Sequence, residues 1–357
     1  MKINLKEIAE RAGVSMMTAS NVINGREGRY SQNTYDLVMR VAAELGYVPN
    51  LAAKHLRDGK MGLLALVLPD IMNPYLSELS QFVIEEADAQ GYTVVLSFTA
   101  NDNKIVQAIV DGSLQLPVDG LMIAPHLVNV SEIKLKVPIV LFSELQSEAP
   151  YDSIVLDNSL IAKTATKHLI DLGYKKIAPI GIVYGSDLGE MPRQRTEGYL
   201  QAMQEAGLKV DPSWMITVDL PNFHRDHGTY VMDQLLALKN RPDAVFCFND
   251  LLALGAIKTV IQKGLRVPED VAVIGVDDIV ESKYYNPSLS TVFVDRQRSA
   301  SLGVQLLLDR IKGTRKGRPE FFEVPFSLMP RESTIGKAYL TTSERLDIST
   351  VDSPGLR

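Results

Sequence analysis

The spacing of hydrophobic residues divides the chain near residue 60. In the first part, apolar residues recur every three or four positions, which is the spacing of helices with one buried face. This pattern predicts three helices, at residues 5–12, 16–23 and 32–45. Gly13 interrupts the first helix, and Ser15 and Ser31 stand where the second and third helices need N-terminal caps. The N-terminal part is therefore predicted to be a small helical domain.

From Met61 onward, continuous apolar runs alternate with amphipathic stretches, as in parallel sheets whose strands are buried on both faces. The predicted strands lie at residues 62–68, 92–98, 119–124, 138–142, 153–157, 175–182, 243–248 and 271–276. One predicted helix ends near residue 90, and three others cover residues 158–173, 193–206 and 249–263. Two similar series indicate an α/β fold with two subdomains of roughly 120 to 150 residues each. A ligand cleft is expected between them, beyond the carboxyl ends of the strands.

Composition narrows the class of protein. With 46% hydrophobic and 22% charged residues, the 357-residue chain is globular rather than disordered in composition. The single cysteine, Cys247, excludes a disulfide framework and zinc sites built from cysteines. The sequence contains neither an apolar run of the roughly 18 residues that a membrane span needs nor an apolar secretory segment after Met1. We therefore expect a soluble, cytoplasmic protein.

Sequence motifs of catalysis and metal binding are missing. The sequence has no Gly-rich phosphate loop and no nucleophile elbow, so we expect neither an enzyme nor a bound cofactor. His224 and His227 are three residues apart, but no third metal ligand lies nearby in the sequence. A pair of surface histidines is therefore favoured over a metal site.

The N-terminal part combines positive charge with the element order of a DNA-binding motif. Residues 1–60 contain nine basic and six acidic residues, whereas the remainder contains 28 basic and 37 acidic ones. A helix, a glycine turn and a capped helix over residues 5–24 match a helix-turn-helix, which places its second helix in the major groove. From periodicity alone, a small helical bundle without DNA binding fits this segment equally well.

The detailed sequence favours DNA binding. The segment LKEIAERAGVSMMTASNVINGREGRYSQNTYDLVMRVAAELGYVPNLAAKHLR resembles the N-terminal region of the LacI/GalR family of transcriptional regulators almost without gaps. The matching positions include Ile8-Ala9, the turn Ala12-Gly13-Val14-Ser15, and the closing stretch at 45–50. The resemblance continues through the rest of the chain to about Glu332.

The resemblance implies a helix-turn-helix domain at residues 1–49, a hinge helix and linker at 50–60, a periplasmic-binding-protein-like core of two subdomains at 61–335, and a polar tail at 336–357. It also implies a repressor at the bacterial nucleoid that binds a pseudo-palindromic operator as a homodimer, under the control of a small sugar or sugar derivative. Regulation by a non-sugar co-repressor or by a partner protein is the alternative. A cytoplasmic solute-binding protein is less favoured, because of the helix-turn-helix.

The resemblance assigns DNA contacts to the second helix and the loop after it: Ser15, Met16, Met17, Thr18, Ser20, Asn21 and Asn24. Short hydroxyls bind phosphates, whereas Met16, Met17 and Asn21 hold the base-reading positions. The family commonly has polar residues at the first two positions and Arg at the third. Two Met side chains can make only apolar contacts, for example with a thymine methyl, whereas Asn21 can pair with adenine. Packing of one Met into the domain is the alternative.

In the hinge, the resemblance assigns DNA contacts to Ala53, Lys54, Leu56 and Arg57. Leu56 matches a leucine that the family inserts into the minor groove, where an apolar wedge kinks the duplex. Lys54 and Arg57 would lie near phosphates. A helix this short is marginal in water, so we expect the hinge to fold with a partner. Without the resemblance, packing of Leu56 on the body would be the favoured interpretation.

For the effector pocket, the resemblance assigns Asp70, Asn73, Tyr75, Asp157, Arg195, Phe223, Asn249 and Asp277. Carboxylates and Arg form charge-assisted hydrogen bonds to ligand hydroxyls, and aromatic rings cover the apolar face of a sugar. Purely structural roles are the alternatives: Asp157 and Asn249-Asp250 can cap helices, and Tyr75 can be part of the core. The segment Phe293-Val294-Asp295 departs from the Arg-Gln usual in the family, which leaves the identity of the ligand open.

Overall fold

The structure is a computed structural model, and it describes residues 4–23, 28–47, 60–99, 108, 117–124, 136–143, 150–183, 190–217 and 223–336. The chain divides into two compact units, Met1–Gly62 and Leu63–Arg357. We call the first unit the head and the second the body. Among the described residues, no helix is both long and apolar enough to cross a membrane.

The head contains the three predicted helices: α1 (Leu5–Arg11), α2 (Met16–Ile23) and α3 (Gln32–Glu44). Both predicted caps are present, because the Ser15 hydroxyl accepts a hydrogen bond from the backbone N–H of Thr18 at 3.0 Å, and Ser31 caps α3 in the same way. Gly13 has a φ of +63°, the left-handed conformation that glycine adopts without strain, and it turns the chain between α1 and α2. The apolar faces of the helices form one small core: Ile8, Ala9, Ala12, Ala19, Val22, Val38, Val41 and Ala42.

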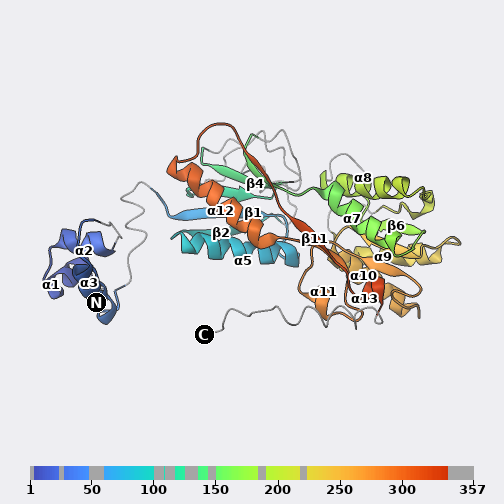
Figure 1. Ribbon diagram of the computed structural model, residues 1–357, viewed down its shortest axis with the longest axis horizontal. Coiled ribbons are helices and arrows are strands. Elements are labelled where there is room, and N and C mark those ends of the chain that lie inside the picture. Colours follow the sequence, from blue (N-terminus) through green and yellow to red (C-terminus); the bar gives the residue numbers. More distant parts are fainter. Residues whose placement is uncertain are drawn as a thin grey trace. The chain divides into compact units, whose positions relative to one another are not determined.

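The body begins with a six-stranded parallel sheet in the order β10-β5-β4-β3-β1-β2, which forms subdomain 1. Its strands are β1 (Leu63–Leu68), β2 (Thr93–Phe98), β3 (Gly120–Ile123), β4 (Ile139–Ser143), β5 (Asp152–Val155) and β10 (Phe321–Glu323). The helices α5 (Pro74–Ala89) and α12 (Arg296–Lys312) pack against each other and against this sheet (Figure 1). The first five predicted strands are thereby confirmed.

Subdomain 2 contains a parallel three-stranded sheet in the order β6-β7-β8 and an antiparallel pair of β9 with β11. Single bridges from Ile274 to Ser290 and from Asp277 to Phe293 place β9 beside the end of β8. The strands are β6 (Ile177–Ile180), β7 (Ala244–Cys247), β8 (Ala272–Ile274), β9 (Thr291–Val294) and β11 (Phe326–Met329). The helices are α7 (Asn158–Asp171), α8 (Glu190–Glu205), α9 (Arg225–Ala237), α10 (Asp250–Gln262), α11 (Glu281–Tyr284), α13 (Glu332–Ile335) and the 3₁₀ turn η2 (Pro212–Trp214).

The chain passes between the subdomains three times, because α12 and β10 return to subdomain 1 before β11 joins subdomain 2. In Figure 1, the orange α12 lies among the blue and green elements of subdomain 1. The three crossings are side by side, since the N–H of Val324 donates to the carbonyl of Val155 at 3.0 Å and that of Asp295 to the carbonyl of Pro325 at 3.3 Å. The two series in the sequence did not predict this return. β10 is only three residues long and mostly exposed, so its pattern carries little signal.

Candidate functional site

The predicted recognition helix, α2, presents two apolar side chains to solvent. Met16 is 59% exposed and Met17 is 73% exposed, so neither packs into the core of the head. At the start of this helix, the hydroxyls of Ser15 and Thr18 are 2.8 Å apart and form a hydrogen bond. This end of α2 therefore carries short hydroxyls beside exposed apolar surface, the combination expected for phosphate contact and thymine contact.

The other residues that we predict to contact DNA differ in their solvent exposure. Asn21 is only 8% exposed, and this burial makes it the weakest of the predicted base-reading positions. Ser20 is half-buried on the same helix. Asn24 and the hinge residues Ala53, Lys54, Leu56 and Arg57 lie outside the described residues, as does the polar tail from residue 337.

In the body, the segment between β1 and α5 carries the first predicted effector residues, and each has a local structural role. Asp70 accepts a hydrogen bond from the N–H of Met72 at 2.8 Å, and Asn73 caps α5 by accepting from the N–H of Tyr75 at 3.0 Å. The other carboxylate oxygen of Asp70 lies 3.4 Å from Nε2 of His224, which precedes α9 in subdomain 2. Polar groups of the two subdomains thus meet beyond the carboxyl end of β1.

Asp157 and Asn249 cap helices, which confirms the structural alternative for both. Asp157 accepts from the N–H of Leu160 at 2.8 Å at the start of α7, and Asn249 accepts from the N–H of Leu252 at 2.8 Å at the start of α10. The amide nitrogen of Asn249 also donates to the carbonyl of Phe223 at 3.0 Å, which brings two of the predicted effector residues together. A role in ligand contact stays a prediction for both caps.

Two close helix contacts position the predicted ligand groups in subdomain 2. A Cβ at Gly198 would lie 2.0 Å from the carbonyl oxygen of Ser159, so only glycine lets α8 approach the start of α7. This approach places the Arg195 side chain against Asn158. A Cβ at Gly228 would lie 2.0 Å from the carbonyl oxygen of Leu252. Glycine at this position therefore lets the start of α9 pack closely against α10.

Arg195 is buried, with 4% of its surface exposed. Its Nε donates to Oδ1 of Asn158 at 2.8 Å, and its Nη1 donates to the carbonyl of Phe248. Burial raises the pKa of Asp277, and the positive charge of Arg195 partly offsets that rise. A buried guanidinium beside a buried carboxyl group can bind a ligand that carries both donors and acceptors, such as a sugar.

Asp277 follows β8 and is held in an unusual backbone conformation. Its φ is 120°, and that of Asp278 is 52°, so two successive non-glycine residues occupy the region that L-residues rarely adopt. Burial raises the pKa of the Asp277 carboxyl to about 7, because the nearby charges of Arg195 and Arg296 only partly offset the loss of solvent. Such strain typically persists where the surrounding structure and function require it.

Asp250 is a second buried carboxyl group, which we did not predict as more than a cap. It accepts hydrogen bonds from the hydroxyl of Thr291 at 2.6 Å, from the hydroxyl of Ser282 at 2.8 Å and from the N–H of Ile279 at 3.0 Å. Burial raises its pKa well above the usual range, and the neighbouring Asp277 raises it further. These bonds tie α10, α11 and β9 together around the loop that carries Asp277.

Arg296, the first residue of α12, was not among the predicted site residues. Its guanidinium donates to the carbonyls of Asp277 and Asp278, the latter at 3.2 Å, and forms an ion pair with Glu78 of α5 at 3.0 Å. The rings of Tyr75 and Phe293 each lie with their centres 5.6 Å from its central carbon. In the sequence, residues 293–295 depart from the family pattern just before Arg296, and this departure was a signal that the position is unusual.

Glu78 and Tyr75 belong to subdomain 1, as does the body of α12, whereas the two carbonyls belong to subdomain 2. Arg296 therefore connects the two subdomains at the crossings of the chain. Tyr75 is half-buried and packs against the main core, as the structural alternative states, and its ring also faces a cation; its ligand contact stays a prediction.

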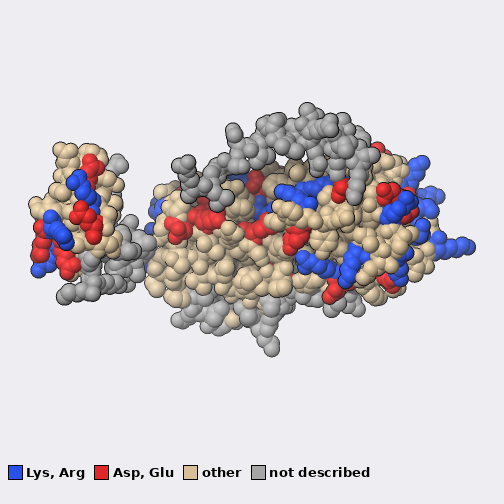
Figure 2. Space-filling view, turned by 90° about the horizontal axis from the view of Figure 1, so that it is seen from below, with Lys and Arg blue, Asp and Glu red and all other residues tan. Residues whose placement is uncertain are grey.

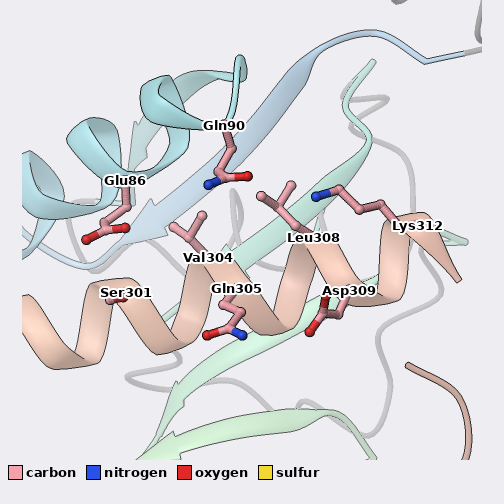
Figure 3. Close-up of a pocket in the computed structure, with 8 residues that line it drawn as sticks. All are labelled: Glu86, Gln90, Ser301, Val304, Gln305, Leu308, Asp309 and Lys312. Carbon is pink, nitrogen blue, oxygen red and sulfur yellow. The ribbon is translucent and has the colours of Figure 1, made fainter. Parts of the chain in front are cut away.

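A separate hollow of about 350 Å³ lies between α5 and α12 (Figure 3). Val304 and Leu308 project toward α5 in this view, and polar side chains surround them. Its lining residues are Glu86, Gln90, Ser301, Val304, Gln305, Leu308, Asp309 and Lys312, none of which is a predicted effector residue. Elsewhere in the described part of the chain, no three His, Cys, Asp or Glu side chains are grouped closely enough to hold a metal ion.

Comparisons with known proteins agree with both parts of the molecule. Residues 4–50 match the family model described as bacterial regulatory proteins, lacI family, and residues 166–334 match the periplasmic binding protein-like domain. The chain is 33% identical to the HTH-type transcriptional repressor PurR of Pasteurella multocida over 86% of this chain and 91% of the relative. It is 32% identical to the ribose operon repressor of Haemophilus influenzae, over 86% and 92% of the two chains.

Solved structures show the same architecture. The lac repressor dimer bound to operator and the anti-inducer ONPF has a TM-score of 0.73 and 26% identity, over 94% of this chain and 99% of that one. The complex of the transcriptional regulator CelR with cellobiose has a TM-score of 0.67 and 28% identity, over 93% and 99%. Both a DNA-bound and a sugar-bound protein are therefore similar to this chain along nearly its whole length.

Proposed function

Since the chain belongs to the LacI family and is a DNA-binding transcriptional repressor with an effector-binding body, we propose that a small sugar-like effector in the cleft of the body sets its affinity for an operator. The single observation that carries this proposal is the buried group formed by Arg195 and Asp277, which come from α8 and from the loop after β8. Buried charges of this kind are costly unless they serve packing partners or a ligand.

The chemistry around this group favours a ligand rich in hydroxyls. Carboxyl and guanidinium groups together can accept from and donate to neighbouring hydroxyls of one sugar ring. The half-buried rings of Tyr75 and Phe223 supply apolar faces, which suit the C–H surface of such a ring. The names of the ribose operon repressor and of the CelR–cellobiose complex also associate relatives with sugars.

In this proposal, residues 1–49 form the DNA-binding domain, residues 50–60 form the hinge, residues 61–335 form the effector core, and residues 336–357 are a polar tail. Ser15, Thr18 and Ser20 contact phosphates, and Met16 and Met17 contact thymine methyl groups. Leu56 inserts into the minor groove. Its replacement by Ala should weaken binding to operator more than binding to random DNA at one salt concentration; equal losses would remove the wedge from the proposal.

The operator is bound by a homodimer in this proposal. Strand β2 lies at the edge of the six-stranded sheet and exposes Val95 (39%) and Leu96 (37%), and the nearby α5 exposes Ile84 (39%). Exposed apolar residues along an edge strand favour association with another chain. Figure 2 shows an extended area with few charged side chains on one face of the body. Light scattering should give twice the mass of one chain; the mass of one chain would contradict the dimer.

The test of the proposed function begins with selection of an operator from random DNA, followed by a thermal-shift screen of sugars, sugar phosphates and nucleobases. A ligand that binds the native protein raises its melting temperature by mass action. The ligand found should change operator affinity by about 5- to 150-fold, the usual range of allosteric coupling. A ligand that lowers operator affinity is an inducer, and one that raises it is a co-repressor.

Replacement of Arg195 or Asp277 by Ala should abolish the response to this ligand, because each change leaves a buried polar partner unsatisfied and removes a ligand contact. Operator affinity without ligand is measured for both variants as a control, and Lys263→Ala, which removes an exposed ion pair with Asp233, serves as the matched surface variant. An unchanged ligand affinity in both Arg195→Ala and Asp277→Ala would contradict the assigned pocket.

A further inference from the structure

Two buried guanidinium groups, rather than one, surround the predicted pocket. Arg195 is 4% exposed and Arg296 is 7% exposed, and the charges of both act on Asp277. An arginine keeps its positive charge at every physiological pH and offers donors only. The pocket therefore contains two fixed positive charges within a small region of the body.

The same region contains donors that have no acceptor. Asn158 is fully buried, and while its Oδ1 accepts from Arg195, its Nδ2 has no hydrogen-bond partner. The Nε of Arg296 is also buried without a partner. Leaving a buried donor unpaired is costly, so such groups in a native protein indicate a missing acceptor.

Two helix starts lie next to these residues, and each has one capping carboxylate, Asp157 on α7 and Asp295 on α12. Asn158 is the first residue of α7, and Arg296 is the first residue of α12; the helices are 14 and 17 residues long. The backbone N–H groups and the dipole at a helix start favour an anion. The chain segments that precede these helices are joined through the 324–325 crossing, because Val324 donates to Val155 and Asp295 donates to Pro325.

The acidic side chains nearby already have donors. Each one either accepts backbone hydrogen bonds, forms an ion pair or accepts several hydrogen bonds: Asp157 with the N–H of Leu160, Asp295 with the N–H of Arg298, Asp70 with the N–H of Met72, Glu78 with Arg296, Asp278 with Arg331 at 2.6 Å, and Asp250 with its three donors. Asp277 is attracted to both arginines, but its burial favours the neutral form of the group. Among the described groups here, two buried donors thus lack an acceptor, Nδ2 of Asn158 and Nε of Arg296.

We propose that the effector carries an oxyanion, as in a sugar acid or a sugar phosphate, and that Arg296 is the residue that selects it. This inference rests on the proposed function, since it names the chemical class of the ligand of the same pocket. The two Nη groups of Arg296 bind carbonyls of subdomain 2 and Glu78. The oxyanion binds at the free Nε edge and at Nδ2 of Asn158, and it replaces Glu78 as the partner of Arg296.

The surroundings of Arg296 are suited to selection by charge. Tyr75 and Phe293 lie at 5.6 Å on its guanidinium and hold the plane in one orientation, so that its planar fork is preorganised for a carboxylate or a phosphate. A neutral sugar cannot replace the charge of Glu78 on Arg296. It would leave the ion pair in place and bind without this contribution.

The experiment compares matched triples of compounds on the full chain by calorimetry: glucose, gluconate and glucose 6-phosphate, and ribose, ribonate and ribose 5-phosphate. In at least one triple, an oxyanion-bearing member should bind about tenfold or more tightly than its neutral parent, the size of one or two charge-assisted hydrogen bonds. The acid and the phosphate of each triple distinguish the two sources of the oxyanion. Equal or tighter binding of the neutral parents would overturn the inference.

Variants locate the selection at Arg296. Arg296→Gln should remove the preference, so that acid and neutral parent bind alike, and Arg296→Lys should retain part of it, because Lys keeps the charge without the fork. Glu78→Gln removes the competing carboxylate and should tighten binding of the oxyanion. Arg225→Gln changes the net charge equally at a half-exposed ion pair with Glu281 and should keep the wild-type preference. A preference that survives in Arg296→Gln would overturn the assignment.

Failure of this inference differs from failure of the proposed function. If the chain binds its selected operator and responds to a neutral sugar only, or to none of the six compounds, the oxyanion class is wrong and the repressor stands. If an oxyanion binds but operator affinity does not change, the ligand class is right and the proposed control of DNA binding is wrong.

Discussion

The head and the body use charge in opposite ways. Within its described residues, the head buries a single polar side chain, Asn21, and its core is made of small and medium aliphatic residues. The body buries ionisable groups next to its cores, among them Arg195, Asp250, Asp277 and Arg296. The head exposes most of its predicted DNA contacts on a small core, whereas the body builds its predicted ligand groups into its interior.

This difference has an energetic cause. A protein that reads DNA meets its ligand from outside, so its contact residues stay on the surface and contribute little to folding. A pocket for a small ligand surrounds its ligand, so its polar groups must be buried and held by other polar groups. Substitutions of exposed contact residues that do not cap a helix should therefore have little effect on the stability of the head, whereas substitutions of the buried polar groups should have large effects on that of the body.

The largest expected effect is on Asp250. Asp250→Ala leaves the donors of Thr291, Ser282 and Ile279 without their acceptor, and we expect the body to lose about 3–5 kcal/mol of unfolding free energy. Trp214 is the single tryptophan and lies buried in the body, so its fluorescence during urea denaturation reports on the body alone. Asp233→Ala, which removes an ion pair between half-exposed side chains, should cost less than about 1 kcal/mol. Similar losses in both would contradict the role of the buried network.

A smaller effect depends on pH and involves Asp277. Burial raises its pKa from 3.8 to about 7, so the folded body holds this proton more tightly than the unfolded chain does. The resulting stabilisation is complete below about pH 4 and is lost as the pH rises through about 7. Asp277→Asn stays neutral and has nearly the same shape as Asp, so both proteins carry the same backbone strain at this position. Between these pH values, wild type should lose about 2–4 kcal/mol relative to this variant.

The measurement is urea denaturation of wild type and Asp277→Asn at several pH values, followed by Trp214 fluorescence. Subtracting the two curves removes the contribution of all other titrating groups that do not interact with Asp277. A stability difference that is constant over the whole pH range would show that the Asp277 carboxyl titrates normally in the folded body.

The smallest effect on stability is expected in the head. Met17 is 73% exposed, so Met17→Ala should change unfolding of the head by less than about 0.5 kcal/mol. The same change should weaken operator binding by about 1 kcal/mol if Met17 contacts a thymine methyl. Operators in which uracil replaces thymine test this contact directly. Wild type should bind them more weakly than the thymine operator, whereas Met17→Ala should bind both operators with the same affinity. Ser15→Ala provides the contrast, with a loss of about 1 kcal/mol in head stability from the missing cap.

Much of this fold was predictable because its signals are local. The helices of the head and their caps at Ser15 and Ser31 follow from spacing and from hydroxyl positions within one turn. The buried strands β1 and β7 follow from continuous apolar runs. Arg195 and Asp277 were identified by resemblance to a family, since nothing in their immediate neighbours distinguishes a pocket residue from any other polar residue near a strand.

Residues that act across the fold were not predictable in the same way. Arg296 lies 218 positions after Glu78 in the sequence, and no periodicity connects the two. Asp250 follows Asn249 as an ordinary first-turn acid, and its three donors come from α11, β9 and the loop before α11. The return of α12 to subdomain 1 brings Arg296 to Glu78, and that return leaves no local signal.

The sequence by itself determined the helices of the head, strands β1–β8, the separation of a DNA-binding head from an α/β body, and the family, because each depends on residues close together in the chain or on a nearly gapless match. Tertiary structure alone decided which charges are buried together. Three crossings between the subdomains bring Glu78, Arg195, Asp277 and Arg296 into one place, although more than two hundred positions separate the first from the last. Burial and long-range contact set the pKa and the partners of these groups, and neither is a property of local sequence.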